Sequence, residues 1–273
     1  MPGWVEVGDH VWYRRYASFD VNVGVVAGAD GLLLVDTRSS PREAAELRAD
    51  LADLPGGPDA VRWVVNTHAH FDHWFGNADF PGAAVYAQAG MPAVAVESLP
   101  EQKEYLAGKG PDWAADMAAL APRFPSELVE LTTTVDVGDR DVLLYHPGLG
   151  HTDHDLVVLV PDASVLYAGD LVEESAPPSY GGGSHPMDWP ETARAATGLG
   201  DPAVVVPGHG AHVDRDFCEA QAADLDAVAR QIRALWADRV PVADALAAGT
   251  WPWNPTLLAE ALARGYATLD ARE

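Results

Sequence analysis

The stretch His68-Ala69-His70-Phe71-Asp72-His73 places three imidazoles and one carboxylate within six consecutive residues. It follows the apolar run 61–67, which predicts a buried strand, so the stretch lies on the loop at the strand's carboxyl end. The first two histidines alternate, and alternate side chains of an extended segment point the same way, so both can bind one ion. The aspartate and the last histidine follow after a turn and favour a second ion beside the first. We interpret the stretch as metal-binding rather than as a polar loop that happens to contain histidine.

Three further residues are candidate ligands, because each follows a strand-like run and lies in a flexible corner. His151 lies in a glycine-rich turn, Asp170 follows the run 165–168, and His209 is flanked by glycines after the run 204–207. Each residue alone carries little weight, since an aspartate after glycine is usually a turn and a lone histidine is usually an ordinary polar residue. Their shared position at strand ends, behind the dense cluster, predicts that they complete the site.

In this order, the motifs between about Trp4 and His212 resemble the metallo-β-lactamase superfamily, the broad group of hydrolases with that fold. The resemblance implies two metal sites that share one ligand. The first metal would be bound by His68, His70 and His151, the second by Asp72, His73 and His209, and Asp170 would bridge the two. Asp36 would buttress the metal-binding loop, although a turn carboxylate at the end of a strand is the alternative interpretation.

The resemblance also implies the cofactors and the chemistry. It implies two Zn²⁺ ions, with iron or manganese as alternatives that bind similar nitrogen and oxygen ligands. A hydroxide bridging the two ions, formed from water near neutral pH, would attack the carbonyl of an ester, lactone, thioester or amide. One ion would polarise that carbonyl, and Asp72 would orient the water or pass its proton to the leaving group. We therefore expect a binuclear zinc hydrolase that acts on a small-molecule substrate.

Three alternative activities differ in the ligands that they require. A bridging Asp170 resembles the glyoxalase II, lactonase and general hydrolase branches, whereas true β-lactamases lack that carboxylate. A mononuclear iron oxygenase of the persulfide dioxygenase type would use His68, His70 and Asp170 and would leave the second site empty. A catalytically silent metal-binding protein would have lost a ligand, and here none is lost. The complete ligand set favours the hydrolase.

Composition argues against several other classes of protein. The chain has 273 residues and 48% hydrophobic content, enough for a sizeable core, but no apolar stretch long enough to span a membrane. The first residues lack the pattern of a secretory signal, so we expect a cytoplasmic location. Cys218 is the only cysteine, which excludes an intramolecular disulfide and a zinc site built from thiolates. A net charge of −24, with Lys103 and Lys109 as the only lysines, argues against nucleic acid as a partner.

Predicted strands come first and then alternate with helices, a pattern typical of an α/β fold. We expect an αββα sandwich, in which two mixed sheets pack together and helices cover their outer faces. A helix is predicted from Pro41 to about Leu54 with Ser40 as its cap, and two more are predicted at 191–198 and 216–239. Strands are expected at 4–7, 11–16, 22–27, 32–36, 61–67, 84–87, 128–131, 142–146, 156–160, 165–168 and 204–207.

The domain organisation follows from the same pattern. Residues 1–214 are predicted to form the catalytic domain, with a helical insertion at about 90–125 and a loop at about 173–189. Residues 215–273 are predicted to be a helical extension of that domain. Tyr180 and His185 of the loop are candidates for the substrate pocket, because a segment rich in glycine and proline has little core to fill. A homodimer contact is one interpretation of the tryptophans in the tail, and capping the edge of a sheet is the simpler one.

Overall fold

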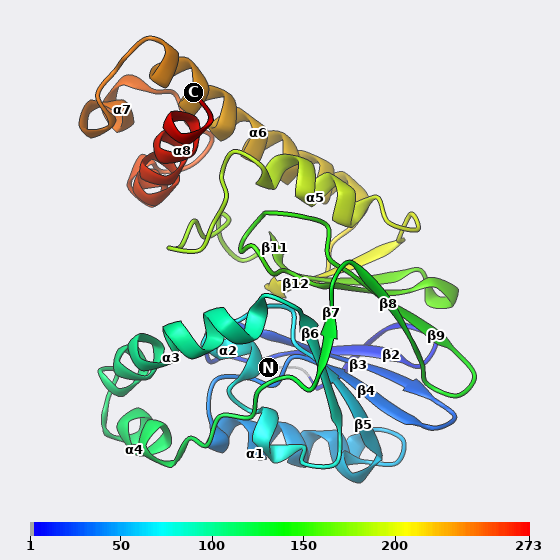
Figure 1. Ribbon diagram of the computed structural model, residues 1–273. Coiled ribbons are helices and arrows are strands. Elements are labelled where there is room, and N and C mark those ends of the chain that lie inside the picture. Colours follow the sequence, from blue (N-terminus) through cyan, green and yellow to red (C-terminus); the bar gives the residue numbers. More distant parts are fainter. Residues whose placement is uncertain (1–2) are drawn as a thin grey trace.

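The computed structural model describes residues 3–273 and contains two β-sheets packed face to face (Figure 1). Helices lie outside both sheets, so the layers follow the order helix, sheet, sheet, helix. The predicted αββα sandwich is thereby confirmed. The first sheet has seven strands and the second has five.

The first sheet keeps the order of the sequence from one edge to the other. Its strands β1 to β4 pair antiparallel, whereas β4 to β7 pair parallel. Parallel strands end at the same edge of a sheet, so the residues that follow β4 and β5 come together there. The strands are β1 (Val5–Gly8), β2 (Val11–Arg15), β3 (Asn22–Gly28), β4 (Gly31–Val35), β5 (Val61–Val65), β6 (Ala84–Gln88) and β7 (Glu127–Val129).

The second sheet has the strand order β12-β11-β10-β9-β8. Its strands are β8 (Thr132–Asp136), β9 (Asp141–Tyr145), β10 (Val157–Val160), β11 (Val165–Glu173) and β12 (Val204–His209). Strands β8 to β11 pair antiparallel, and only β11 and β12 pair parallel. The carboxyl-terminal parts of β11 and β12 therefore lie side by side, and they carry Asp170 and His209.

Apolar side chains from the inner faces of both sheets form the core between them. Leu33 and Val65 of the first sheet share one buried cluster with Leu144 of the second. Tyr167 of β11 ties the sheets together, because its hydroxyl donates to the backbone of β2 at 2.7 Å. Its ring lies so close to β3 that a Cβ on Gly24 would come within 2.3 Å of it, so only glycine fits there.

Helices form the two outer layers. On the side of the first sheet lie α1 (Pro41–Asp50), α2 (Phe71–Trp74), α3 (Met91–Ala107) and α4 (Pro111–Ala119); on the other lie α5 (Trp189–Thr197), α6 (Arg215–Ala237), α7 (Val242–Ala248) and α8 (Ala259–Arg272). Short 3₁₀ turns occur at Leu51–Asp53, Pro58–Ala60, Asn77–Asp79, Pro161–Ala163 and Pro255–Leu258. Ser40 caps α1, since its hydroxyl accepts the Glu43 N–H at 3.3 Å. Within residues 3–273, no helix combines the length and apolar character needed to cross a bilayer.

Three expectations about these elements were wrong. Strand β11 continues to Glu173, because the chain passes Gly169 with a φ of 54° and pairs again with β12 after a shift of register. Asp170 therefore lies inside a strand rather than after one. Strand β8 was missed because it is an edge strand in which only Val135 is buried. The first helix ends at Asp50, and a 3₁₀ turn occupies the residues that were expected to continue it.

Candidate metal centre

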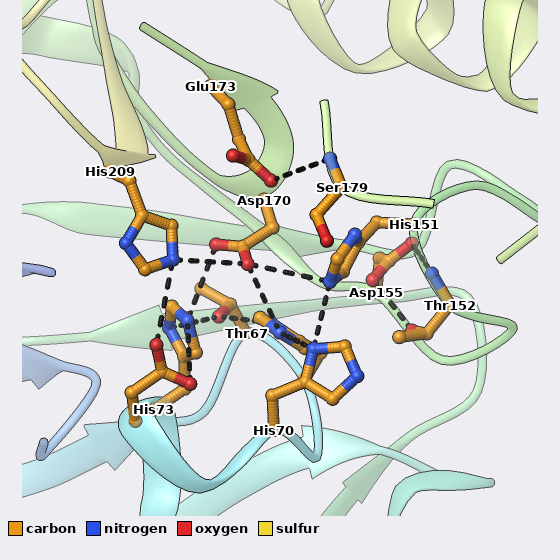
Figure 2. A network of polar contacts seen from close by, with 12 residues as sticks. Thr67, His70, His73, His151, Thr152, Asp155, Asp170, Glu173, Ser179 and His209 are labelled. Carbon is orange, nitrogen blue, oxygen red and sulfur yellow. Dashed lines mark hydrogen bonds and ion pairs between the residues drawn. The ribbon is translucent and has the colours of Figure 1, made fainter. Parts of the chain in front are cut away.

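Side chains from the loop after β5, the turn after β9, strand β11 and the end of β12 converge (Figure 2). Residues 67–73, which follow β5, are called the metal loop below. The structure brings together all seven residues that were predicted as ligands. They form two groups whose ligand atoms lie within 4.8 Å of one another: His68, His70, His151 and Asp170, and Asp72, His73 and His209.

In the first group three imidazoles face one another. His70 Nδ1 lies 2.9 Å from both His68 Nε2 and His151 Nε2. Asp170 Oδ2 lies 3.6 Å from the His68 nitrogen and 3.4 Å from the His151 nitrogen. His68 and His151 are buried, whereas His70 is half-buried. Imidazole nitrogens gathered around one point form the kind of ligand set that zinc prefers.

Asp170 also contacts the second group. Its Oδ1 lies 3.3 Å from His73 Nε2, and its Oδ2 lies 3.3 Å from His209 Nε2. Asp72 completes this group, with its Oδ2 3.6 Å from the same nitrogen of His209. Figure 2 shows the Asp170 carboxylate among the imidazoles of both groups. Its position allows one carboxylate to serve two ions.

Two glycines make room for Asp170. Gly169 precedes it in the left-handed conformation, which glycine adopts without steric cost. Gly208 of β12 faces the carboxylate, and a Cβ at that position would lie 1.8 Å from Asp170 Oδ1. His209 therefore reaches the side of Asp170 only because the residue before it has no side chain.

Buried polar atoms without a hydrogen-bond partner show that the cluster suits an ion. Among residues 3–273 these atoms include His73 Nε2, His151 Nδ1 and Asp170 Oδ1. Such an atom costs about 1–3 kcal/mol when it is left without a partner. Coordination of an ion would remove part of that cost, and imidazole with carboxylate is a common zinc ligand set. The residues present therefore fit metal ions.

Burial and the Asp170 carboxylate shift the pKa values of the histidines in opposite directions. Burial holds the pKa of His68 well below its usual value and lowers the pKa of His151 to about 3, so both imidazoles are neutral at neutral pH. Burial also acts to lower the pKa of His209, but the Asp170 carboxylate outweighs it and raises that pKa to about 10. Burial favours a neutral Asp170, but His209 and the other imidazoles hold its pKa well below the usual range. An ionised carboxylate thus lies at the centre of the cluster.

Asp36 lies beneath the metal loop and fixes its orientation. Its Oδ2 accepts hydrogen bonds from His73 Nδ1 at 2.8 Å and from the Thr67 hydroxyl at 2.8 Å. Its Oδ1 accepts the Thr67 N–H at 2.8 Å. Because His73 Nδ1 is held in this way, His73 Nε2 is left to face the cluster.

Sequence reasoning missed the polar residues that hold the ligand-bearing turns. Asn66 Nδ2 donates to the His73 carbonyl and to Asn77 Oδ1, both at 3.0 Å, and so ties the two ends of the metal loop together. On the other side of the cluster, Asp155 accepts the N–H and the hydroxyl of Thr152, at 2.9 and 2.6 Å. Burial raises the pKa of Asp155 to about 6. The only signal for these residues in the sequence is that they stand near a ligand.

The loop between β11 and α5 lies against the cluster. Its Tyr180 is 4% exposed and packs against Trp189 with ring centroids 5.1 Å apart, so the loop has a core, contrary to the reasoning from its composition. His185 is half-buried, and its N–H donates to the Gly150 carbonyl at 2.8 Å. Glu173, which was not predicted, is buried at the start of the loop, and burial together with Asp170 raises its pKa to about 8. The pocket roles of Tyr180 and His185 stay predictions.

These features define an α/β sandwich protein with a metal-binding cluster of histidine and aspartate. The family model of the metallo-β-lactamase superfamily matches residues 18–209. The chain belongs to this superfamily, and its cluster places it among the hydrolases of that fold.

Two solved structures share the fold at low sequence identity. The metallo-β-lactamase from Pontibacter korlensis has a TM-score of 0.65 and 21% identity, and the match covers 82% of this chain and 98% of that one. The metallo-β-lactamase FIM-1 from Pseudomonas aeruginosa, in its mono-zinc form, has a TM-score of 0.62 and 22% identity, with 83% and 95% covered. At this identity the likeness concerns the fold alone.

Two relatives with similar sequences bear the name acyl-coenzyme A thioesterase MBLAC2. The protein from Gallus gallus is 25% identical over 208 residues, which is 72% of this chain and 75% of that protein. The protein from Homo sapiens is 25% identical over 221 residues, which is 74% of this chain and 79% of that protein.

Proposed function

We propose that the chain is a binuclear zinc hydrolase that cleaves acyl thioesters of a small-molecule thiol. The observation that carries this proposal is the position of Asp170, whose carboxylate oxygens lie 3.3–3.6 Å from imidazoles of both ligand groups. A mononuclear centre would need only one group, whereas here the second group is complete and its ligand atoms converge.

The ligand groups assign a role to each residue. One ion would be held by His68, His70 and His151, the other by Asp72, His73 and His209, and Asp170 would bind both. Zinc ions held there supply Lewis-acid polarisation of a carbonyl and make water a stronger acid. Asp36 keeps His73 in the orientation that the second ion requires, through its 2.8 Å hydrogen bond with Nδ1.

Asp72 is the residue that would move the proton. It is 6% exposed, and its carboxylate lies beside His73 and His209 at the reacting end of the cluster. In our proposal it takes the proton of the attacking water as the new C–O bond forms. It returns that proton to the sulfur of the departing thiol as the C–S bond breaks.

Both named relatives support a thioester over the other carbonyl compounds that such a site can hydrolyse, because both are called acyl-coenzyme A thioesterases. His185 is proposed to face the substrate from the loop after β11. Tyr180, which is buried, is proposed to act on the substrate only through the shape of that loop.

Metal content and substrate hydrolysis test the proposal together. The purified protein would be analysed by mass spectrometry and assayed on matched thioester, ester, lactone and cephalosporin substrates. About two zinc ions per chain and preferential thioester turnover are expected. His70→Ala should abolish turnover, whereas His10→Ala, whose side chain is 59% exposed, should retain it. One iron per chain with no hydrolysis would contradict the proposal.

A further inference from the structure

A groove of about 590 Å³ lies between the turn after β2 and the amino-terminal ends of α1 and α4. We call it the α1–α4 groove. It contains three of the 17 basic residues of a chain whose net charge is −24, and one of only two lysines. Its walls include Tyr16, Arg38, Arg42, Lys109, Gly110 and Trp113.

The two arginines of the groove are already paired with carboxylates. Arg38 is buried and lies 3.4 Å from Glu43 and 2.9 Å from Glu46. Arg42 lies 2.9 Å from Asp116. These pairs neutralise most of the charge in the groove, so a ligand would not be recognised by the arginines alone.

Lys109 differs from both arginines. Its Nζ lies 4.3 Å from the ring centroid of Tyr105 and 5.2 Å from that of Phe19. No carboxylate of residues 3–273 lies within the 4.0 Å limit of an ion pair with it. Its ammonium group therefore remains available to an anion, and the two rings hold it beside the groove.

Helix α4 begins at Pro111, two residues after Lys109, and adds N–H donors to the same part of the groove. Gly110 provides no side chain to cap the helix, and Ala114 is the residue whose N–H bonds back to Gly110, at 2.9 Å. The N–H groups of Asp112 and Trp113 thus have no partner within the helix. A Cβ built on Gly110 would meet nothing within 4 Å, so the space beside this residue at the start of α4 is open. Such a helix start suits a phosphate group, although the Asp112 carboxylate in the first turn opposes one.

Aromatic side chains connect the groove with the metal loop. Phe19 contacts Trp113 with ring centroids 5.3 Å apart and Phe71 with centroids 4.8 Å apart. Phe71 stands between the ligands His70 and Asp72 in the sequence. The carbonyl of Phe19 accepts a hydrogen bond from His209 Nδ1 at 2.9 Å. Two ring contacts, Trp113 with Phe19 and Phe19 with Phe71, thus separate the wall of the groove from the metal loop.

We propose that the α1–α4 groove binds the phosphate-bearing nucleotide end of a coenzyme A-type thiol while the acyl thioester lies at the metal centre. A phosphate contacts Lys109 and the free N–H groups at the start of α4. The planar base packs against Trp113 beside Arg42, whose guanidinium lies over that ring, 5.3 Å from its centroid. The arm of the thiol crosses Phe19 and Phe71. This inference rests on the proposed thioesterase function and adds where the substrate is recognised away from its reacting carbonyl.

Hydrolysis of two thioesters with the same acyl group tests the groove, one made with coenzyme A and one with N-acetylcysteamine, which lacks the nucleotide. Lys109→Met should lower kcat/KM for the first relative to the second about tenfold, the effect of one lost charge-assisted hydrogen bond. Lys103→Met is the matched control, because it removes the other lysine, which does not line the groove. An unchanged ratio in Lys109→Met would overturn the proposal.

Calorimetry with adenosine 3′,5′-bisphosphate and the metal-loaded protein measures nucleotide binding in the groove independently of thioester hydrolysis. Binding should weaken about tenfold in Lys109→Met and strengthen in Asp112→Asn, which removes the opposing carboxylate from the first turn of α4. If binding changes in this way but the protein hydrolyses no thioester, the nucleotide site in the groove is supported and the proposed function is wrong. If the protein hydrolyses thioesters but does not bind the nucleotide, or binds it equally in wild type and Lys109→Met, the proposed function is supported and the proposed nucleotide site is wrong.

Discussion

The two halves of the metal centre are built in different ways. The half that belongs to the first sheet draws four proposed ligands from six consecutive residues of one loop, His68 to His73. The half that belongs to the second sheet draws three ligands from separate segments: His151 from the turn after β9, Asp170 from β11 and His209 from the end of β12.

This difference extends to the residues that support the ligands. In the first half Asp36 contacts both ends of the metal loop, at Thr67 and His73, and Asn66 also bonds to the His73 carbonyl, so the residues of one loop share their support. In the second half two of the three residues, His151 and His209, have separate supports. Asp155 holds the turn of His151, and the carbonyl of Phe19 holds His209. Support residues of the first half should therefore matter more than those of the second.

The largest effect is expected at the residue that joins the halves. Asp170→Ala removes the carboxylate that contacts four imidazoles, and it should cost the second metal before the first. Turnover should fall by at least about 100-fold, measured together with metal content. Asp162→Ala, at a side chain 53% exposed, serves as the control. Two metals and full activity in Asp170→Ala would show that the halves do not share this ligand.

Asp36→Asn tests the support of the first half. The amide keeps the size of the side chain but cannot accept from both His73 and Thr67 as the carboxylate does. Zinc affinity should fall about 100-fold, which is the upper end of the range of losses for residues that orient metal ligands. Competition with a chromogenic chelator measures that affinity. A wild-type affinity would mean that the metal loop keeps its shape without Asp36.

Asp155→Asn is the corresponding change in the second half. It disturbs the turn of His151 and leaves the metal loop intact, because the side-chain hydrogen bonds of Asp155 reach only Thr152. Zinc affinity should fall about tenfold, at the lower end of the same range. The chelator assay used for Asp36→Asn gives a direct comparison. A loss as large as that of Asp36→Asn would refute the contrast between the halves.

The smallest effect is expected at a contact between the tail and the loop after β11. Arg264 of α8 donates to the carbonyls of Gly182 and Ser184, and the next residue, His185, bonds the turn before His151. Arg264→Met should raise KM about fivefold through loss of these hydrogen bonds. It should also speed proteolysis at Gly181–Gly183, with the exposed Arg230→Met as control. Equal KM and equal proteolysis in both variants would show that the tail does not hold the loop.

The same contrast explains which parts of the fold were predictable. Strands such as β4 and β5 were placed within one or two residues, because they are apolar runs closed by polar turns. Strand β8 was missed because pairing at the edge of a sheet buries only Val135. Asn66 and Asn77, which hold the metal loop, have amide side chains at no recognisable spacing. That residues 215–273 extend the same domain stays a prediction.

The sequence alone predicts a metal-binding cluster in this chain, because residues that are neighbours in the chain, such as His68 and His70, remain neighbours in any fold. Only the tertiary structure decided that Asp170 contacts both ligand groups. It also decided that Lys109 and Trp113 line one groove with Tyr16 and Arg42. Such contacts depend on the packing of the sheets, on the register of β11 with β12 and on the missing side chain of Gly208. No local pattern of residues encodes them, because they join segments that are far apart in the chain.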